Sequence, residues 1–136
     1  MRIFLLLSLI FFSSFSFACT CATPSLAESF EKADYVYIGQ IQSSELTSET
    51  EVTNFLSIEE EFKGHRDTDI LMSEVSYSSC ASPSGVGYKY LIFGNFGEQP
   101  KLQSCSQTQI LSSFKEELIS ELKKLAANTY EPPGCQ

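Results

Sequence analysis

Residues that commonly serve as catalysts are scarce in this sequence. It has one histidine, His65, in the polar run 64–67, and no second histidine that could form a pair of metal ligands with it. A glycine-rich phosphate loop and a Cys-x-x-Cys motif are also absent. No nucleophile stands near His65 at a spacing typical of covalent catalysis, so we interpret His65 as a solvated loop residue. The sequence therefore argues against an enzyme.

Basic residues are few as well, with 9 lysines and arginines against 17 aspartates and glutamates and a net charge of −8. Such a surface repels phosphate backbones and anionic lipid headgroups, so we expect no nucleic-acid partner. A closed tetrahedral zinc site is not expected either. Cys19 and Cys21 have only one distant histidine to complete it, and we expect no cofactor of the protein's own.

Long hydrophobic runs are confined to the first part of the chain. Residues 1–18 combine Arg2, a short apolar core and small residues near Ala18, which is the pattern of a secretory signal peptide. The core is too short for a typical membrane span, and an uncleaved anchor is the alternative. Cleavage after Ala18 would leave a single domain, residues 19–136, that begins with Cys19. Five cysteines in that domain fit an oxidising compartment, so we expect a secreted protein, or a periplasmic or cell-surface one in a bacterium.

Aromatic and β-branched residues predict a series of strands. We expect five, at residues 35–38, 52–62, 70–77, 89–96 and 102–106. The first should be buried on both faces, and Gly39 should mark a bulge or the close approach of another backbone. The carboxylate run 59–61 lies on the second strand, where we interpret it as the solvated part of a strand and not as a catalytic pair.

A helix is predicted on each side of the strands. Ser25 begins a capping box, and a short helix should run from it to about Ala33. Ser113 begins a second capping box, before a longer helix whose apolar stripe should pack in the core. The stripe consists of Phe114, Leu118, Leu122 and Leu125, widened by Ile119 and Ala126. This order predicts a mainly β domain, a five-stranded closed barrel of the OB type, with an open sandwich as the alternative.

Cysteine stands at the predicted mature N-terminus and again two residues later, in Cys19-Thr20-Cys21. This start resembles that of the tissue inhibitors of metalloproteinases, in which Cys-x-Cys directly follows the signal peptide. Shorter similarities cover nearly all of residues 19–136. They are Ser29-Phe30 with residues 33–36, Phe62-Lys63-Gly64, residues 90–94 with Cys105, and Gly134-Cys135. The resemblance implies a netrin-like OB fold with two disulfides, Cys19–Cys80 and Cys21–Cys105.

The resemblance also implies a function, the inhibition of zinc metalloproteases. The α-amine and carbonyl oxygen of Cys19 would chelate the partner protease's catalytic zinc at the coordination position that normally holds water. The amine must bind without its proton, which its ordinary pKa of about 8 permits near neutral pH. Thr20 would enter the specificity pocket, with the loop around the third cysteine alongside. The protease-contacting residues implied in this way are Cys19, Thr20, Cys21, Ser78, Ser79, Cys80 and Ala81.

One feature departs from the family, and two other readings of the N-terminal cysteines stay open. Glu31 occupies the position of the cysteine that would pair with Cys135, so Cys135 is expected to be unpaired or in an intermolecular disulfide. The chain could instead be a netrin-like protein-interaction module whose Cys-x-Cys is purely structural, because fold alone does not assign function. Cys19 could also be lipidated, although Ser16 and Phe17 depart from the usual lipoprotein signal.

Overall fold

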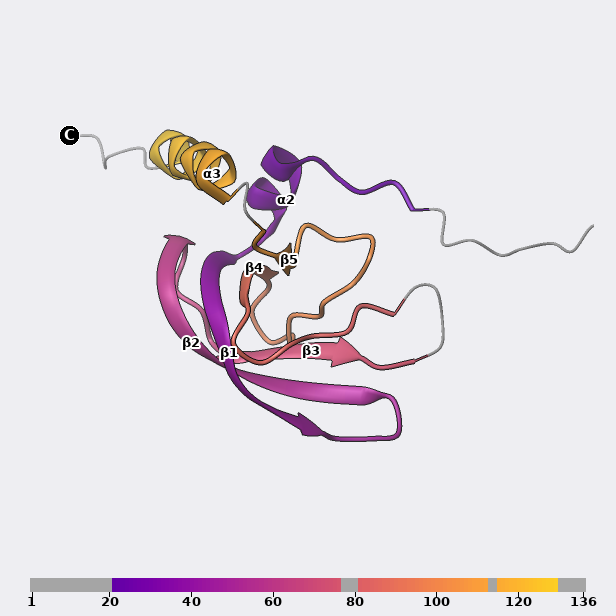
Figure 1. The fold of residues 1–136 in the computed structure, drawn as a ribbon. Helices are drawn as coiled ribbons and strands as arrows, with labels where there is room; N and C mark the ends of the chain where they lie inside the picture. The colour runs from indigo at the N-terminus through magenta and orange to yellow at the C-terminus, as the bar shows by residue number, and fades with distance from the viewer. Residues whose placement is uncertain (1–20, 77–80, 113–114, 130–136) are drawn as a thin grey trace, which may run out of the picture.

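The computed structural model describes residues 21–76, 81–112 and 115–129. In chain order the elements are α2 (Leu26–Lys32), β1 (Tyr35–Leu46), β2 (Glu51–Lys63), β3 (Ile70–Glu74), β4 (Lys89–Gly94), β5 (Gln109–Ile110) and α3 (Lys115–Thr129). The strands form one antiparallel sheet in the order β3-β2-β1-β4-β5, and both helices lie at the same end of it (Figure 1). The predicted mainly β fold, with one helix before the strands in sequence and one after them, is therefore confirmed.

The predicted closed barrel is not confirmed, because the sheet remains open between β3 and β5. Across that gap the described residues form one isolated parallel bridge, between Met72 and Lys101. Met72 donates its backbone N–H to the carbonyl of Pro100, and the N–H of Leu102 donates to the carbonyl of Met72, both at 2.8 Å. The chain then turns away from β3, as a backbone hydrogen bond from Ser106 to the carbonyl of residue 103 indicates. The strand predicted at 102–106 is therefore wrong, and β5 forms later, at Gln109–Ile110.

The first two strands form a hairpin that is longer than predicted. Residues 43–46, predicted as loop, pair with residues 52–55 of β2. All four residues are exposed, Leu46 included, because this part of the hairpin extends beyond the core. Gly39 marks a bulge, as one of the two expectations had it, but the atoms closest to it belong to side chains and not to another backbone. The β1–β2 register shifts between Ile38 and Gly39, and a Cβ at Gly39 would lie 3.1 Å from the Leu56 Cδ2 atom.

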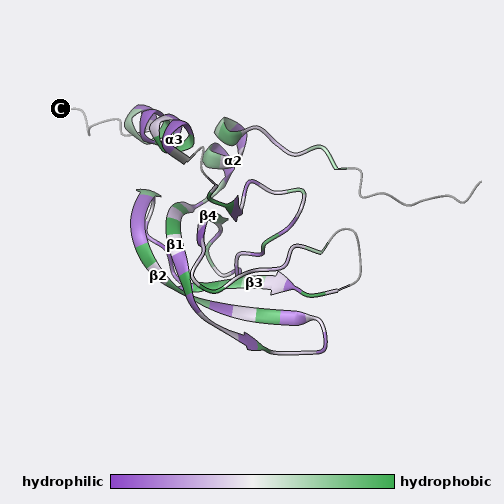
Figure 2. Cartoon of the chain, viewed as in Figure 1, coloured by the Kyte–Doolittle hydropathy of each residue, from purple (hydrophilic) through white to green (hydrophobic). Residues whose placement is uncertain are grey.

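Each face of the sheet carries its own apolar cluster, and Figure 2 shows apolar segments on β1, β2 and α2. One cluster consists of Tyr35, Tyr37, Ile41, Leu56, Leu71, Tyr90, Ile92 and Leu102. The other joins the sheet to the helices through Phe30, Ala33, Val36, Ile38, Leu91 and Leu122. Alternate residues of β1 therefore point to opposite clusters, which confirms the prediction of a strand buried on both faces.

The stripe on α3 packs in the core as predicted. Leu122 is fully buried, and Leu118, Ile119, Leu125 and Ala126 pack against the same cluster. The predicted cap Ser113 and the stripe residue Phe114 lie outside the described residues. No helix in the described part of the chain is both long and apolar enough to cross a membrane.

Helix α2 is held in place at both of its ends. The Ser25 Oγ atom accepts a hydrogen bond from the N–H of Glu28 at 3.2 Å, which confirms the predicted cap. At the other end, the Lys63 Nζ atom donates to the carbonyls of Phe30 and Glu31, at 2.7 and 2.9 Å. Gly64 follows with φ of +58°, and a Cβ there would lie 2.3 Å from the carbonyl oxygen of residue 34. The Lys-Gly pair therefore joins the end of β2 to the last turn of α2.

Candidate functional site

A disulfide joins the segment before α2 to the turn before β5. Cys21 and Cys105 are 84 residues apart in sequence, and their Cα atoms are 5.5 Å apart. The structure thus contains the Cys21–Cys105 pairing that the family resemblance implied. Because its two ends are so distant in the chain, the disulfide restricts the unfolded state strongly. It also fixes the chain two residues after the predicted mature N-terminus.

A second contact holds the same segment a few residues further on. The Gln107 Nε2 atom donates a hydrogen bond to the carbonyl oxygen of Pro24 at 2.7 Å. Pro24 directly precedes Ser25, the cap of α2. Residues 21–25 are therefore held by the disulfide at one end and by the helix cap at the other, with Gln107 between them.

The loop that follows Cys80 also contacts this turn. The Ser82 and Ser104 Oγ atoms lie 3.1 Å apart in a hydrogen bond, and Ser104 is the direct neighbour of Cys105. Further along, the N–H of Gly85 donates to the Tyr90 hydroxyl at 3.0 Å. The turn at Cys105 is thus the common neighbour of the N-terminal segment and of the loop after Cys80.

A groove with a volume of about 770 Å³ runs beside this turn. Its lining includes Cys105 itself and the Gln107 that holds Pro24, together with Lys32 and Lys101. The groove therefore opens next to the segment that leads to the predicted mature N-terminus.

The structure covers the predicted site residues only in part. Cys21 is exposed and Ala81 is half-buried. Five of the predicted residues lie outside the described part of the chain, and the expected Cys19–Cys80 disulfide lies there with them; they are Cys19, Thr20, Ser78, Ser79 and Cys80. The described residues bring the segments that carry Cys21 and Ala81 to the same turn.

Three residues that hold these segments were missed from the sequence: Ser82, Ser104 and Gln107. Their bonds join residues 22 and 83 positions apart. A serine or glutamine in a loop gives no local signal of such a partner, because its contacts depend on how the whole chain is folded.

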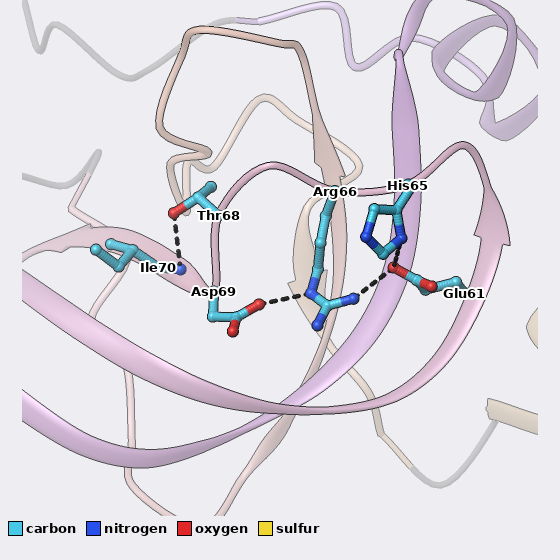
Figure 3. Close-up of polar contacts among 6 residues, drawn as sticks. All are labelled: Glu61, His65, Arg66, Thr68, Asp69 and Ile70. Atoms are coloured by element: carbon cyan, nitrogen blue, oxygen red, sulfur yellow. Dashed lines mark hydrogen bonds and ion pairs between the residues drawn. The ribbon is translucent and has the colours of Figure 1, made fainter.

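A cluster of charged side chains around His65, away from the turn at Cys105, has a structural role (Figure 3). The Arg66 guanidinium binds Glu61 at 2.5 Å and Asp69 at 2.6 Å, and so connects the end of β2 to the start of β3. Burial alone would raise the pKa of Glu61, but the hydrogen bond and charge of Arg66 lower it overall. His65 lies 3.5 Å from the same carboxylate, with 83% of its side chain exposed. This agrees with its interpretation as a solvated residue.

The neighbouring carboxylates of β2 have basic partners. Lys89 lies 2.7 Å from Glu59, and Lys123 of α3 lies 3.1 Å from Glu60. The run 59–61 is therefore ion-paired at the surface instead of merely solvated. Within the described ranges, no three histidine, cysteine, aspartate or glutamate side chains come close enough to hold a metal ion.

No protein-family model matches the sequence, and no curated protein matches it at a significant level. The function must therefore be argued from the residues and their geometry, because a β-sheet with two helices is compatible with many activities.

Proposed function

We propose that this protein is a secreted inhibitor of zinc metalloproteases. The α-amine and carbonyl oxygen of Cys19 would chelate the catalytic zinc of the partner protease. The observation that carries the proposal is the Cys21–Cys105 disulfide, which fixes the chain two residues after Cys19. A disulfide also fits the oxidising compartment to which the signal-like residues 1–18 would direct the chain.

Chelation of the protease zinc by Cys19 is favoured by a rigid N-terminus. A free terminus would lose conformational entropy on entering a protease cleft, and prior attachment to the domain reduces that loss. The disulfide and the Gln107–Pro24 hydrogen bond limit the movement of residues 21–25. In the proposed complex, the amine nitrogen and the carbonyl oxygen of Cys19 form a five-membered ring with the zinc. The Cys19 sulfur would not be a ligand, because the proposal places it in a disulfide with Cys80.

A second contact region would come from the loop around Cys80. The Ser82–Ser104 hydrogen bond draws this loop toward the Cys105 turn, and so toward the segment of Cys21. Ser78, Ser79 and Ala81 would then lie alongside Thr20, which would enter the specificity pocket. The complete fold under this proposal is a netrin-like OB barrel, with the Met72–Lys101 bridge marking the position at which its open side would close.

The direct test changes the terminus while leaving the rest of the chain intact. One alanine added before Cys19 would separate the amine from the chelating carbonyl and place extra backbone in the cleft. Acetylation of the Cys19 amine would remove its lone-pair basicity. We expect either change to reduce inhibition at least about a hundredfold with unchanged thermal stability, because losing only an outer-shell partner of a metal ligand already costs about 10- to 100-fold in metal affinity. Thr20→Gly is the matched control, because it empties a pocket and should weaken binding selectively among proteases.

N-terminal sequencing of the secreted protein must accompany the test, to show that Cys19 is the first residue and that its amine is free. Inhibition that survives the alanine extension would contradict chelation by the terminus. A correctly processed protein that inhibits no zinc protease in a broad panel would contradict the proposed function, and would favour a netrin-like interaction module.

A further inference from the structure

A buried side-chain amide connects the sheet to the loop that follows Cys80. Asn54 of β2 is fully buried. Its Nδ2 atom donates to the carbonyl of Leu71 at 2.8 Å and to the Ser73 Oγ atom at 2.9 Å, both on β3. Its Oδ1 atom accepts from the Ser44 hydroxyl of β1 and from the Ser84 hydroxyl, each at 2.7 Å. One amide therefore binds two strands and one loop.

Three of these groups form a closed ring of hydrogen bonds. Because the Asn54 Oδ1 atom can only accept, the Ser84 hydroxyl must donate to it. The Ser73 hydroxyl, which accepts from Asn54, is then free to donate to Ser84, whose Oγ atom lies 2.8 Å away. Each bond in such a ring polarises the next, and the ring fixes all three side chains. Only a side chain with both a donor and an acceptor can complete this ring from the position of Asn54.

The ring is connected to the candidate site through the segment between Ser84 and Ser82. Two residues before Ser84, Ser82 is hydrogen-bonded to Ser104, the neighbour of Cys105. Cys105 in turn is joined to Cys21. Residues 81–84, here called the docking loop, are thus held against the sheet at Ser84 and against the Cys105 turn at Ser82.

We propose that Asn54 and Ser84 are positioning residues, which set the place of the docking loop relative to the Cys21 segment and thereby the affinity for a protease. The inference rests on the proposed function. Asn54 itself is fully buried and would touch no partner. Its effect on binding would act entirely through Ser84 and the backbone of the docking loop, because a shift of that loop would separate two surfaces that must meet the protease together.

Ser84→Ala and Ser44→Ala form a matched pair for the test. Each removes one hydroxyl that donates to the same Asn54 oxygen at the same distance, but Ser44 lies on β1 and only Ser84 lies on the docking loop. We expect Ser84→Ala to weaken inhibition of a susceptible zinc protease about tenfold, mainly through faster dissociation. Ser44→Ala should weaken it less than about twofold, although both variants lose a hydrogen bond to Asn54. Ser84→Ala also loses the bond with Ser73, which belongs to the same ring.

Amide hydrogen exchange reports the position of the loop without a protease. The N–H of Gly85 directly follows Ser84 and donates to the Tyr90 hydroxyl, so its exchange rate depends on the placement of the loop. We expect Ser84→Ala to accelerate exchange at Gly85 about tenfold and Ser44→Ala to leave it unchanged. Equal loss of inhibition in both variants, or unchanged Gly85 exchange in Ser84→Ala, would overturn the inference. If the wild-type protein inhibits nothing, the proposed function fails, while Gly85 exchange still decides whether Asn54 and Ser84 position the loop.

Discussion

The two faces of the sheet are covered in different ways. On one face, α2 and α3 pack through apolar side chains, among which Phe30 and Leu122 are the most deeply buried from the helices. The other face is covered partly by irregular chain, which contributes Leu102 to the core and Ser84 to the ring around Asn54. Apolar packing is non-directional and mainly stabilises the fold. Hydrogen bonds and a disulfide are directional, so they fix the position of segments that have no regular structure of their own.

The largest effect is expected on the helix-covered face. Leu122→Asp would place a carboxylate at a fully buried position, and should lower the free energy of unfolding by about 4 kcal/mol or more. The yield of secreted, folded protein and urea unfolding would measure this. Ser120→Asp is the control, because it introduces the same charge at an exposed position of the same helix and should change stability by less than about 0.5 kcal/mol. Normal folding of Leu122→Asp would show that the stripe does not pack on the sheet.

A smaller but still large effect is expected where the irregular segments are cross-linked. Replacing Cys21 and Cys105 together by alanine opens a loop closed by residues 84 positions apart. The chain-entropy model then predicts a loss of about 4 kcal/mol in the free energy of unfolding. Urea denaturation of the double variant beside the wild-type protein would measure it. A loss below about 1 kcal/mol would mean that the other contacts of residues 21–25 already restrict this segment.

The smallest losses of stability are expected for substitutions of Lys63 and Lys123, each of which joins a strand to a helix. Lys63→Met removes two charged hydrogen bonds to the last carbonyls of α2, and should cost about 2 kcal/mol. Lys123→Met removes an ion pair with Glu60 whose side chains are 60% and 42% exposed, and should cost about 0.3 kcal/mol. Only the second loss should disappear in 1 M salt. Equal losses for both would show that the Lys63 contacts are as weak as an exposed pair.

The sequence predicted correctly those elements whose structure depends on residues close together in the chain. The aromatic and β-branched residues of β1 and the spacing of leucines on α3 give the same periodicity in sequence and in structure. The cap at Ser25 followed from three neighbouring residues. The far end of β1 was missed because residues 43–45 are polar and all of residues 43–46 are exposed, although they pair fully with β2.

The rest depends on contacts between distant parts of the chain. β5 has two residues, and its position is set by pairing with β4 after the turn at Cys105, which no periodicity could reveal. The Cys21–Cys105 pairing came from a family resemblance and not from spacing. Gln107 and Asn54 could not be recognised as structural polar residues from the sequence, because their partners lie on other elements.

The open sheet has a consequence for self-association. β3 pairs with β2 only at residues 51–55, so beyond the contact at Leu56 no strand covers the outer edge of β2 in the part of the chain that the structure describes. An uncovered edge of this kind is a template for strand addition and aggregation. Glu59, Glu60 and Glu61 lie on this stretch of β2 in ion pairs with Lys89, Lys123 and Arg66, and a second copy approaching edge to edge would have to desolvate these charged groups. Replacing them with apolar β-formers would therefore be expected to favour intermolecular sheets.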